Sequence, residues 1–154
     1  IDHFKQVNDS HGYSIGDEVL CEVAQRLQNV LRGQDLVARL GGEEFLVIIS
    51  NTDLALARRV AERLCACISA TPFIVSAGQL SLNVTVSVGV AHGFERQEDP
   101  EFMVQRADVA MYAAKRTGRN RICVAGEADA SVPTDADVSD AGEPKMQTEA
   151  GNEG

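Results

Sequence analysis

A short turn built from two glycines and two carboxylates most constrains how this 154-residue chain can fold. Residues 41–45 read Gly-Gly-Glu-Glu-Phe, and apolar, strand-forming runs flank this turn at 36–38 and 45–49. A glycine turn between two such runs predicts a β-hairpin, because glycine adopts turn geometries freely and leaves room for another molecule beside the backbone. Adjacent carboxylates repel one another unless a cation offsets their charge. The tip is therefore a candidate site for a hard divalent ion and a phosphorylated substrate, and a plain solvated hairpin is the alternative.

The remaining pattern predicts helices packed against a sheet. Apolar residues recur at helical spacing in segments at about 17–31, 52–69 and 100–117. We expect the first helix to begin at Asp17 after a loop over 8–16 and to end at Gly33. Asn51 or Thr52 would cap the second helix, and Asp99 followed by Pro100 suits the start of the third. Strand-like segments are expected at 1–4, 36–38, 45–49, 73–75, 80–90 and 121–124. Two hairpins among these strands make the sheet at least partly antiparallel, which argues against a doubly wound parallel sheet.

Charge divides the chain into two parts. The net charge is −9, yet residues 126–154 hold eight acids and one lysine, so residues 1–125 are nearly neutral. The acidic segment has no aromatic residue and few large apolar ones. We therefore predict one folded domain over 1–125, followed by a disordered tail over 126–154. Near neutrality of the folded part argues against a nucleic-acid partner held by bulk charge.

The sequence carries neither membrane nor export signals, because it has no apolar run long enough to cross a bilayer and no signal-peptide pattern. The four cysteines, at 21, 65, 67 and 123, form no C-x-x-C pair, which argues against a zinc ribbon or a thioredoxin-type motif. We therefore expect reduced thiols in a cytoplasmic protein.

Several short motifs precede and follow the predicted hairpin along the sequence. They are Ile1-Asp2-His3-Phe4-Lys5, Asn8-Asp9, Gly16-Asp17, Arg32-x-x-Asp35, Ser87-Val88-Gly89-Val90, Ala107-Asp108, Ala114-Lys115 and Gly118-Arg119-Asn120. With these motifs and its glycine turn, the chain resembles, over residues 1–124, the catalytic GGDEF domain of bacterial diguanylate cyclases of the response-regulator type, in the GGEEF form. The resemblance implies an α/β (α+β) fold with a ferredoxin-like core and a central, largely antiparallel sheet with packed helices. This fold is related to polymerase palms and class III nucleotide cyclases.

The same resemblance implies an activity. Members of the family condense two GTP molecules into cyclic di-GMP with release of pyrophosphate, in a homodimer whose two sites face each other. In-line attack of a ribose 3′-hydroxyl on an α-phosphate would be helped by Mg²⁺ or Mn²⁺, the ions expected with oxygen ligands.

The resemblance also assigns roles to individual residues. The implied catalytic residues are Gly41, Gly42, Glu43 and Glu44, with Glu44 proposed to help deprotonate the 3′-hydroxyl. The implied metal contacts are Glu43, the Ile1 carbonyl and Asp2. The implied substrate contacts are Asn8 and Asp17 at the guanine, and His3, Phe4, Lys115 and Arg119 at the phosphates. Aspartate can accept hydrogen bonds from guanine donors that adenine does not offer together. Taken singly, Asp17 could equally cap a helix, and Lys115 and Arg119 could offset a helix dipole.

A second nucleotide site is implied by Arg32-Gly33-Gln34-Asp35, which matches the family's R-x-x-D motif. In the family this motif binds a dimer of cyclic di-GMP and inhibits the enzyme by product feedback, and Arg59 and Arg63 match arginines that complete such a site. Arginine offers a bidentate fork to guanine or phosphate, and aspartate accepts from a guanine edge. An ordinary Arg–Asp surface pair is the alternative.

The start of the chain departs from the family pattern. Of the usual D-x-D metal motif only Ile1 and Asp2 are present. We therefore expect a fragment that lacks one metal-binding aspartate and an upstream sensory or receiver domain, and that could be inactive alone. The competing hypotheses are a catalytically inactive regulatory module that binds GTP or cyclic di-GMP, and a scaffold that only dimerises. The intact Glu43 and Glu44 favour the enzyme for the full-length parent.

Overall fold

The computed structural model describes residues 1–93 and 99–127 of the chain. Within them the helices are α1 (Phe4–His11), α2 (Tyr13–Val30), α3 (Leu54–Ser69) and α4 (Pro100–Arg116). The strands are β1 (Leu36–Gly41), β2 (Glu44–Ile48), β3 (Phe73–Val75), β4 (Leu80–Leu82), β5 (Ser87–Val90) and β6 (Arg121–Val124). The predicted acidic tail lies outside the described residues from 128 onward. Among the described helices, none is long and apolar enough to cross a membrane.

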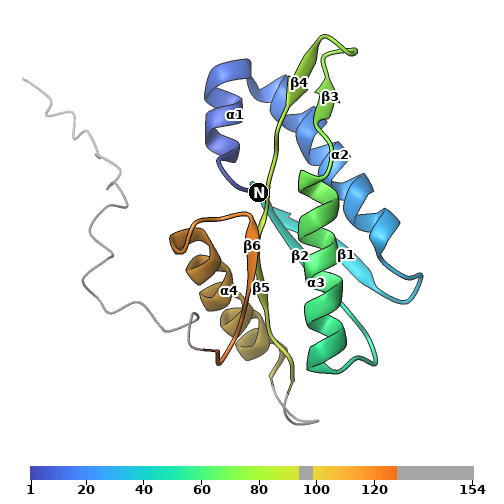
Figure 1. Ribbon diagram of the computed structural model, residues 1–154, viewed down its shortest axis with the longest axis vertical. Helices are drawn as coiled ribbons and strands as arrows, with labels where there is room; N and C mark the ends of the chain where they lie inside the picture. The colour runs from blue at the N-terminus through green and yellow to red at the C-terminus, as the bar shows by residue number, and fades with distance from the viewer. Residues whose placement is uncertain (94–98, 128–154) are drawn as a thin grey trace, which may run out of the picture.

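The strands pair two by two (Figure 1). β1 and β2 form an antiparallel hairpin, as do β3 and β4, whereas β5 and β6 run parallel. α3 packs on one side of the β5–β6 pair and α4 on the other, so this pair is the middle of three layers (Figure 1). The combination of packed helices with mostly antiparallel strands confirms the predicted α/β class.

The main core lies where α2, α3 and β3 meet. Val19 and Val23 of α2, Ile68 of α3 and Phe73 of β3 are fully buried. The four-residue spacing on α2 places both valines on one face of the helix, as burial of an amphipathic helix requires. Small side chains fill the space beside β5 and β6, namely Ala57 and Ala61 of α3 and Ala110, Ala113 and Ala114 of α4. Because alanines let a helix approach a strand closely, they fix where α4 presents its C-terminal end.

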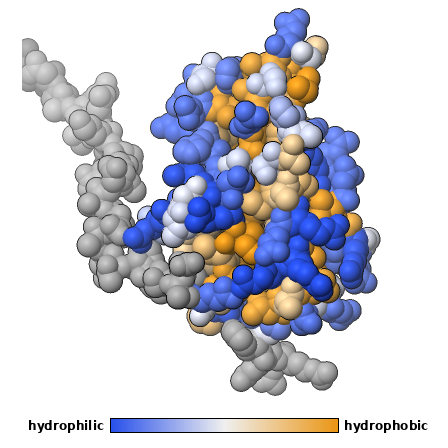
Figure 2. All heavy atoms as spheres, in the orientation of Figure 1, coloured by the Kyte–Doolittle hydropathy of each residue, from blue (hydrophilic) through white to orange (hydrophobic). Residues whose placement is uncertain are grey.

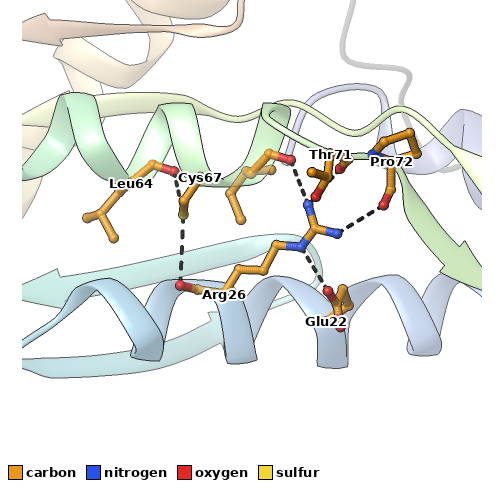
Figure 3. Close-up of polar contacts among 7 residues, drawn as sticks. Glu22, Arg26, Leu64, Cys67, Thr71 and Pro72 are labelled. Carbon is orange, nitrogen blue, oxygen red and sulfur yellow. Dashed lines mark hydrogen bonds and ion pairs between the residues drawn. The ribbon is translucent and has the colours of Figure 1, made fainter.

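Arg26 ties the C-terminal end of α3 to α2 (Figure 3). Its Nε lies 2.8 Å from the Glu22 carboxylate, and its other nitrogens donate to the carbonyl oxygens of Ile68, Thr71 and Pro72. The last carbonyls of a helix have no intrahelical partners. Arg26 therefore supplies donors at the point where the chain leaves α3 for β3.

The structure corrects the predicted loop over 8–16. α1 spans Phe4–His11, and α2 begins at Tyr13 rather than at Asp17. The polar residues of this segment have low helix propensity, but Phe4 and Val7 pack into the main core, and tertiary contacts override propensity. Residues 1–3 precede α1 and form no strand, so the prediction of a strand at 1–4 is wrong for this described part of the chain. α2 ends at Val30, before the expected Gly33.

The predicted strand over 80–90 is split into β4 and β5. β4 pairs with β3, while β5 pairs with β6, so one apolar alternation serves two separate strand pairs. Periodicity alone cannot reveal such a change of partner. The cap of α3 also differs from the expectation of Asn51 or Thr52, because the Asp53 carboxylate accepts from the Leu56 amide at 2.7 Å. α4 begins after Asp99 as predicted.

Candidate active site

The hairpin tip between β1 and β2 has the predicted form. The strands are antiparallel, and their register shifts once, between Arg39 and Gly41. Gly42 has a φ of 49°, a left-handed conformation that favours glycine. The Arg39 guanidinium donates to the Gly42 carbonyl at 2.7 and 3.0 Å and so braces the turn. The braced tip leaves Glu43 partly buried and Glu44 exposed.

Glu43 meets Lys115 across the fold. Lys115 Nζ lies 3.4 Å from Glu43 Oε1, and the two side chains are 25% and 31% exposed, respectively. The Ile1 amine donates to the Glu43 carbonyl at 3.0 Å. Three residues that the sequence assigned to metal and phosphate thus lie together at the tip. Because both side chains remain partly exposed, the ion pair is accessible from solvent.

These residues suit a small divalent ion that shares its ligands with the substrate. Residues 1–93 and 99–127 contain no group of three or more His, Cys, Asp or Glu side chains arranged to hold a metal. Mg²⁺, however, is commonly held by one or two carboxylates together with substrate phosphates and water. The Glu43 carboxylate, with the backbone of Ile1 beside it, fits that mode of binding.

The Asp2 carboxylate is held by a different set of protein groups. It is 5% exposed, and its carboxylate accepts from the hydroxyls of Thr85 and Ser87, both at 2.7 Å, and from the Asn120 amide at 3.0 Å. Burial alone would raise the pKa of Asp2, but these hydrogen bonds outweigh burial and hold the pKa below its usual value. Both carboxylate oxygens are thus engaged by protein donors. The assignment of Asp2 to the metal remains a prediction.

Sequence reasoning missed Thr85 and Ser87. A signal was present, because Thr85, Ser87 and Gly89 alternate with the valines at 84, 86 and 88. Alternate residues of an extended chain point to the same side, so two hydroxyls on one side marked a polar partner. Only the fold identifies that partner as Asp2.

The chain turns sharply after α4. The helix ends at Arg116, and Arg119 and Asn120 have φ values of 58° and 46°, in a region that few non-glycine residues adopt. The Arg119 amide donates to the Ala114 carbonyl at 2.9 Å. Lys115 thus lies on the last turn of α4, while Arg119 lies in the loop that follows it.

The predicted guanine contacts lie on consecutive helices. Asn8 of α1 faces Gly16 of α2 so closely that a Cβ added to Gly16 would lie 1.9 Å from Asn8 Oδ1. Asn8 Oδ1 is buried and has no hydrogen-bond partner within the described part of the chain. Buried polar atoms are normally paired, so this unpaired oxygen is an exception that fits the predicted role of Asn8 as a ligand contact. Asp17, next to Gly16, is exposed.

A groove runs between α2 and the hairpin. Its lining residues are Leu20, Cys21, Ala24, Gln28, Val37, Ala38, Arg39 and Phe45. Asp17 lies one helical turn before Leu20 and Cys21, on the same side of α2. Mostly apolar walls with a few polar groups are typical of small-molecule sites, so the groove is a candidate position for a flat heterocycle.

His3 and Phe4 form the N-terminal end of α1. His3 has a left-handed backbone, and no side chain among the described residues caps this end of the helix. The first amides of a helix lack intrahelical partners and attract anions. This end is therefore a suitable phosphate contact through its backbone, while the Phe4 side chain is buried in the core.

Arg32 and Asp35 form the turn between α2 and β1. The Arg32 amide donates to Asp35 Oδ2 at 3.0 Å, and the Asp35 amide donates to the Arg32 carbonyl at 2.9 Å. Asp35 Oδ1 is buried without a hydrogen-bond partner among the described residues. Arg59 and Arg63 are exposed on α3, over which hydrophilic side chains gather in Figure 2. All these arginines are thus accessible to an anionic ligand.

Fold and site together define a mixed α/β domain in which a hairpin carboxylate, a helix-end lysine and a groove surround one candidate nucleotide site. The chain belongs to the GGDEF family, since the family model described as "Diguanylate cyclase, GGDEF domain" matches residues 1–121. This match confirms the family resemblance inferred from the motifs.

Curated proteins with similar sequences support the assignment to this family. Response regulator PleD of Caulobacter vibrioides is 48% identical over 122 residues, which cover 79% of this chain and 27% of that protein. Diguanylate cyclase DgcP of Pseudomonas aeruginosa is 46% identical over 125 residues, which cover 81% of this chain and 18% of that protein. The chain therefore spans about a quarter of the length of PleD and less of DgcP.

Solved structures confirm the family fold. The GGDEF domain of YfiN from Pseudomonas aeruginosa has a TM-score of 0.76 and 38% identity, covering 82% of this chain and 78% of that one. The GGDEF domain of DgcB from Caulobacter crescentus, solved in complex with c-di-GMP, has a TM-score of 0.77 and 34% identity, covering 82% and 74%.

Proposed function

We propose that this chain is the catalytic domain of a diguanylate cyclase, which condenses two GTP molecules into cyclic di-GMP and releases two pyrophosphates in the cytoplasm. The observation that carries the proposal is the contact of Glu43 with Lys115 at 3.4 Å. It brings a carboxylate suited to a metal ion and a cation suited to phosphate to one point beside the groove.

Each residue has a role in this proposal. Asn8 and Asp17 read the guanine edge, since their side chains can supply the acceptors that guanine N1–H and its amine require. Lys115, Arg119 and the backbone amides of His3 and Phe4 hold the β- and γ-phosphates. Gly41 and Gly42 leave room for the nucleotide beside the hairpin backbone.

The chemistry is an in-line displacement. Glu44 takes the proton as the 3′-hydroxyl oxygen of one GTP bonds to the α-phosphorus of the other, and the bond from that phosphorus to pyrophosphate breaks. A repeat of the step with the roles exchanged closes the ring. Mg²⁺ or Mn²⁺ held by Glu43 and the Ile1 carbonyl, with Asp2 as a further candidate ligand, would supply charge stabilisation at the α-phosphate and the attacking oxygen.

The reaction needs two copies of the domain. Each copy would hold one GTP, so the chain would act as a homodimer with facing sites. An upstream sensory or receiver domain in the full-length protein would control that pairing.

Product would act back on the enzyme through a second site. Arg32 and Asp35, with Arg59 and Arg63 of α3, would bind cyclic di-GMP, because the arginines are exposed and Asp35 retains an unpaired buried oxygen. In an Arg32→Ala variant, turnover should stay high as product accumulates. Inhibition as strong as in the parent would contradict this site.

The test of activity uses the chain fused to a parallel dimeric coiled coil, which raises the effective concentration of one site at the other. The fusion is incubated with GTP and Mg²⁺ or Mn²⁺, and the products are identified by mass. We expect cyclic di-GMP from GTP, none from ATP, and none from a Glu43→Gln variant. Glu101→Gln, an exposed change at the far end of α4, is the matched control and should keep activity.

A regulatory module without catalysis is the second candidate. The engagement of Asp2 by protein donors favours it, because both oxygens of that carboxylate already accept hydrogen bonds from the protein. GTP binding without product from the dimeric fusion would decide for this candidate.

A further inference from the structure

We propose that Asp2 is a positioning residue, which holds the loop of residues 117–120 so that Arg119 and the end of α4 face the triphosphate. The proposal rests on the proposed function, since it concerns the phosphate side of that same site. It differs from the role that the sequence suggested for Asp2, which was contact with a metal ion.

The first support is the complete set of partners around the Asp2 carboxylate. Oδ1 accepts from Ser87, while Oδ2 accepts from Thr85 and from the Asn120 amide, at 2.7 to 3.0 Å. A buried carboxylate is tolerated only when hydrogen bonds of this kind replace its water. Ser87 is the first residue of β5 and Thr85 lies two residues before it, whereas the third donor belongs to the loop after α4. The carboxylate therefore fastens that loop to the sheet.

The second support is the backbone of the loop itself. Arg119 and Asn120 are both left-handed, and such residues persist only where their surroundings hold them. The Arg119 amide is held by Ala114 within the same segment. The Asn120 amide is held by Asp2, which lies 118 positions away in the chain. Loss of this contact would release the loop at the residue next to Arg119.

The third support is the place of Asp2 in the chain. It lies between Ile1, whose amine contacts the hairpin tip, and His3, which opens α1. The backbone of Asp2 thus connects the residue that contacts the hairpin to the helix end that suits phosphate, while its carboxylate holds the loop that bears Arg119. This arrangement suits a residue that sets the spacing between groups that contact different parts of one nucleotide.

The experiment compares the affinities of GTP and GMP for the chain by calorimetry, in EDTA and again in Mg²⁺. The ratio of the two affinities measures the contribution of the β- and γ-phosphates. In an Asp2→Asn variant we expect the ratio to fall about fivefold to tenfold in EDTA as well as in Mg²⁺. In an Arg119→Ala background the same substitution should change the ratio by less than about twofold, because the group that Asp2 positions is gone.

Controls separate this role from the others. Asp9→Asn, an exposed change on α1, should leave the ratio unchanged. If Asp2→Asn does not fold, Thr85→Val and Ser87→Ala each remove one donor, and each should lower the ratio about twofold to threefold.

Four results would overturn the proposal. A fall seen only in Mg²⁺ would assign Asp2 to the metal, and an equal fall for GTP and GMP would show a general structural role. An unchanged ratio in every variant, with a parent that binds GTP, would refute the role of Asp2 alone. A parent that does not bind GTP would overturn the proposed function as well.

Discussion

Replacing Gly89 with alanine should displace α4 and, with it, one side of the candidate active site. A Cβ at residue 89 would lie 1.8 Å from the Ala107 carbonyl oxygen and 2.4 Å from the Met111 amide nitrogen. Both are backbone atoms of α4, so neither can swing aside as a long side chain can. Ordinary contacts of a Cβ begin at 3.4 Å, so α4 would have to retreat by about 1.6 Å.

The energy of this shift follows from what α4 buries. Ala110 and Ala114 are fully buried between α4 and the β5–β6 pair, and a gap of roughly 1 Å already loses about half of the dispersion energy of a contact. Overpacked cores typically lose about 1–3 kcal/mol. We expect the upper end, about 3 kcal/mol, because the whole helix must move. In a domain of this size that loss lowers the melting temperature by about 10 °C.

Urea unfolding followed by far-ultraviolet circular dichroism measures the loss. Gly33→Ala is the matched control, since an added Cβ at residue 33 meets no atom of residues 1–93 and 99–127 within 4 Å. That variant should stay within about 0.5 kcal/mol of the parent or gain slightly from a less flexible unfolded chain. GTP affinity should fall in Gly89→Ala alone, because Lys115 moves with α4. Equal stability of the two variants would show that the close packing of α4 against Gly89 does not limit the size of residue 89.

Three further predictions concern other parts of the fold. Arg26→Lys should lower the unfolding free energy by about 2 kcal/mol. Lysine cannot replace the carbonyl contacts of the guanidinium or its stacking 3.9 Å from the centroid of the Phe73 ring. An unchanged midpoint of urea unfolding would contradict this prediction. Iodoacetamide should label exposed Cys21 first, and GTP should slow that reaction, because Cys21 lines the groove. Burial raises the pKa of the Cys65 thiol and keeps this thiol unreactive. Mass spectrometry of time points measures the order of labelling, and early labelling of Cys65 would contradict the prediction. The depressed pKa of Asp2 adds stability that is present above the ordinary aspartate pKa, about 3.9, and is lost as the pH falls through the lower folded-state pKa. Between pH 5 and pH 2, the unfolding free energy measured in urea should therefore decline less steeply in Asp2→Asn than in the parent. Identical slopes would count against this prediction.

The sequence by itself determined the local elements of the site. The hairpin tip follows from two glycines between strand-forming runs, and the start of α4 follows from an Asp-Pro pair, because turn and cap chemistry act over a few neighbouring residues. The order of short motifs was sufficient to identify the family, which the match over residues 1–121 confirms.

Only the tertiary structure decided how these elements meet. α1 forms against its own propensity because Phe4 is buried in the core and Val7 packs against it, and the segment 80–90 divides because its two ends have different partners. The contact between Glu43 and Lys115 joins residues 72 positions apart, and the bond from Asn120 to Asp2 joins residues 118 positions apart. Periodicity and capping describe neighbours within a few residues along the chain. The orientation of Asp2 therefore depends on packing that brings the first residues, β5 and the end of α4 to one point.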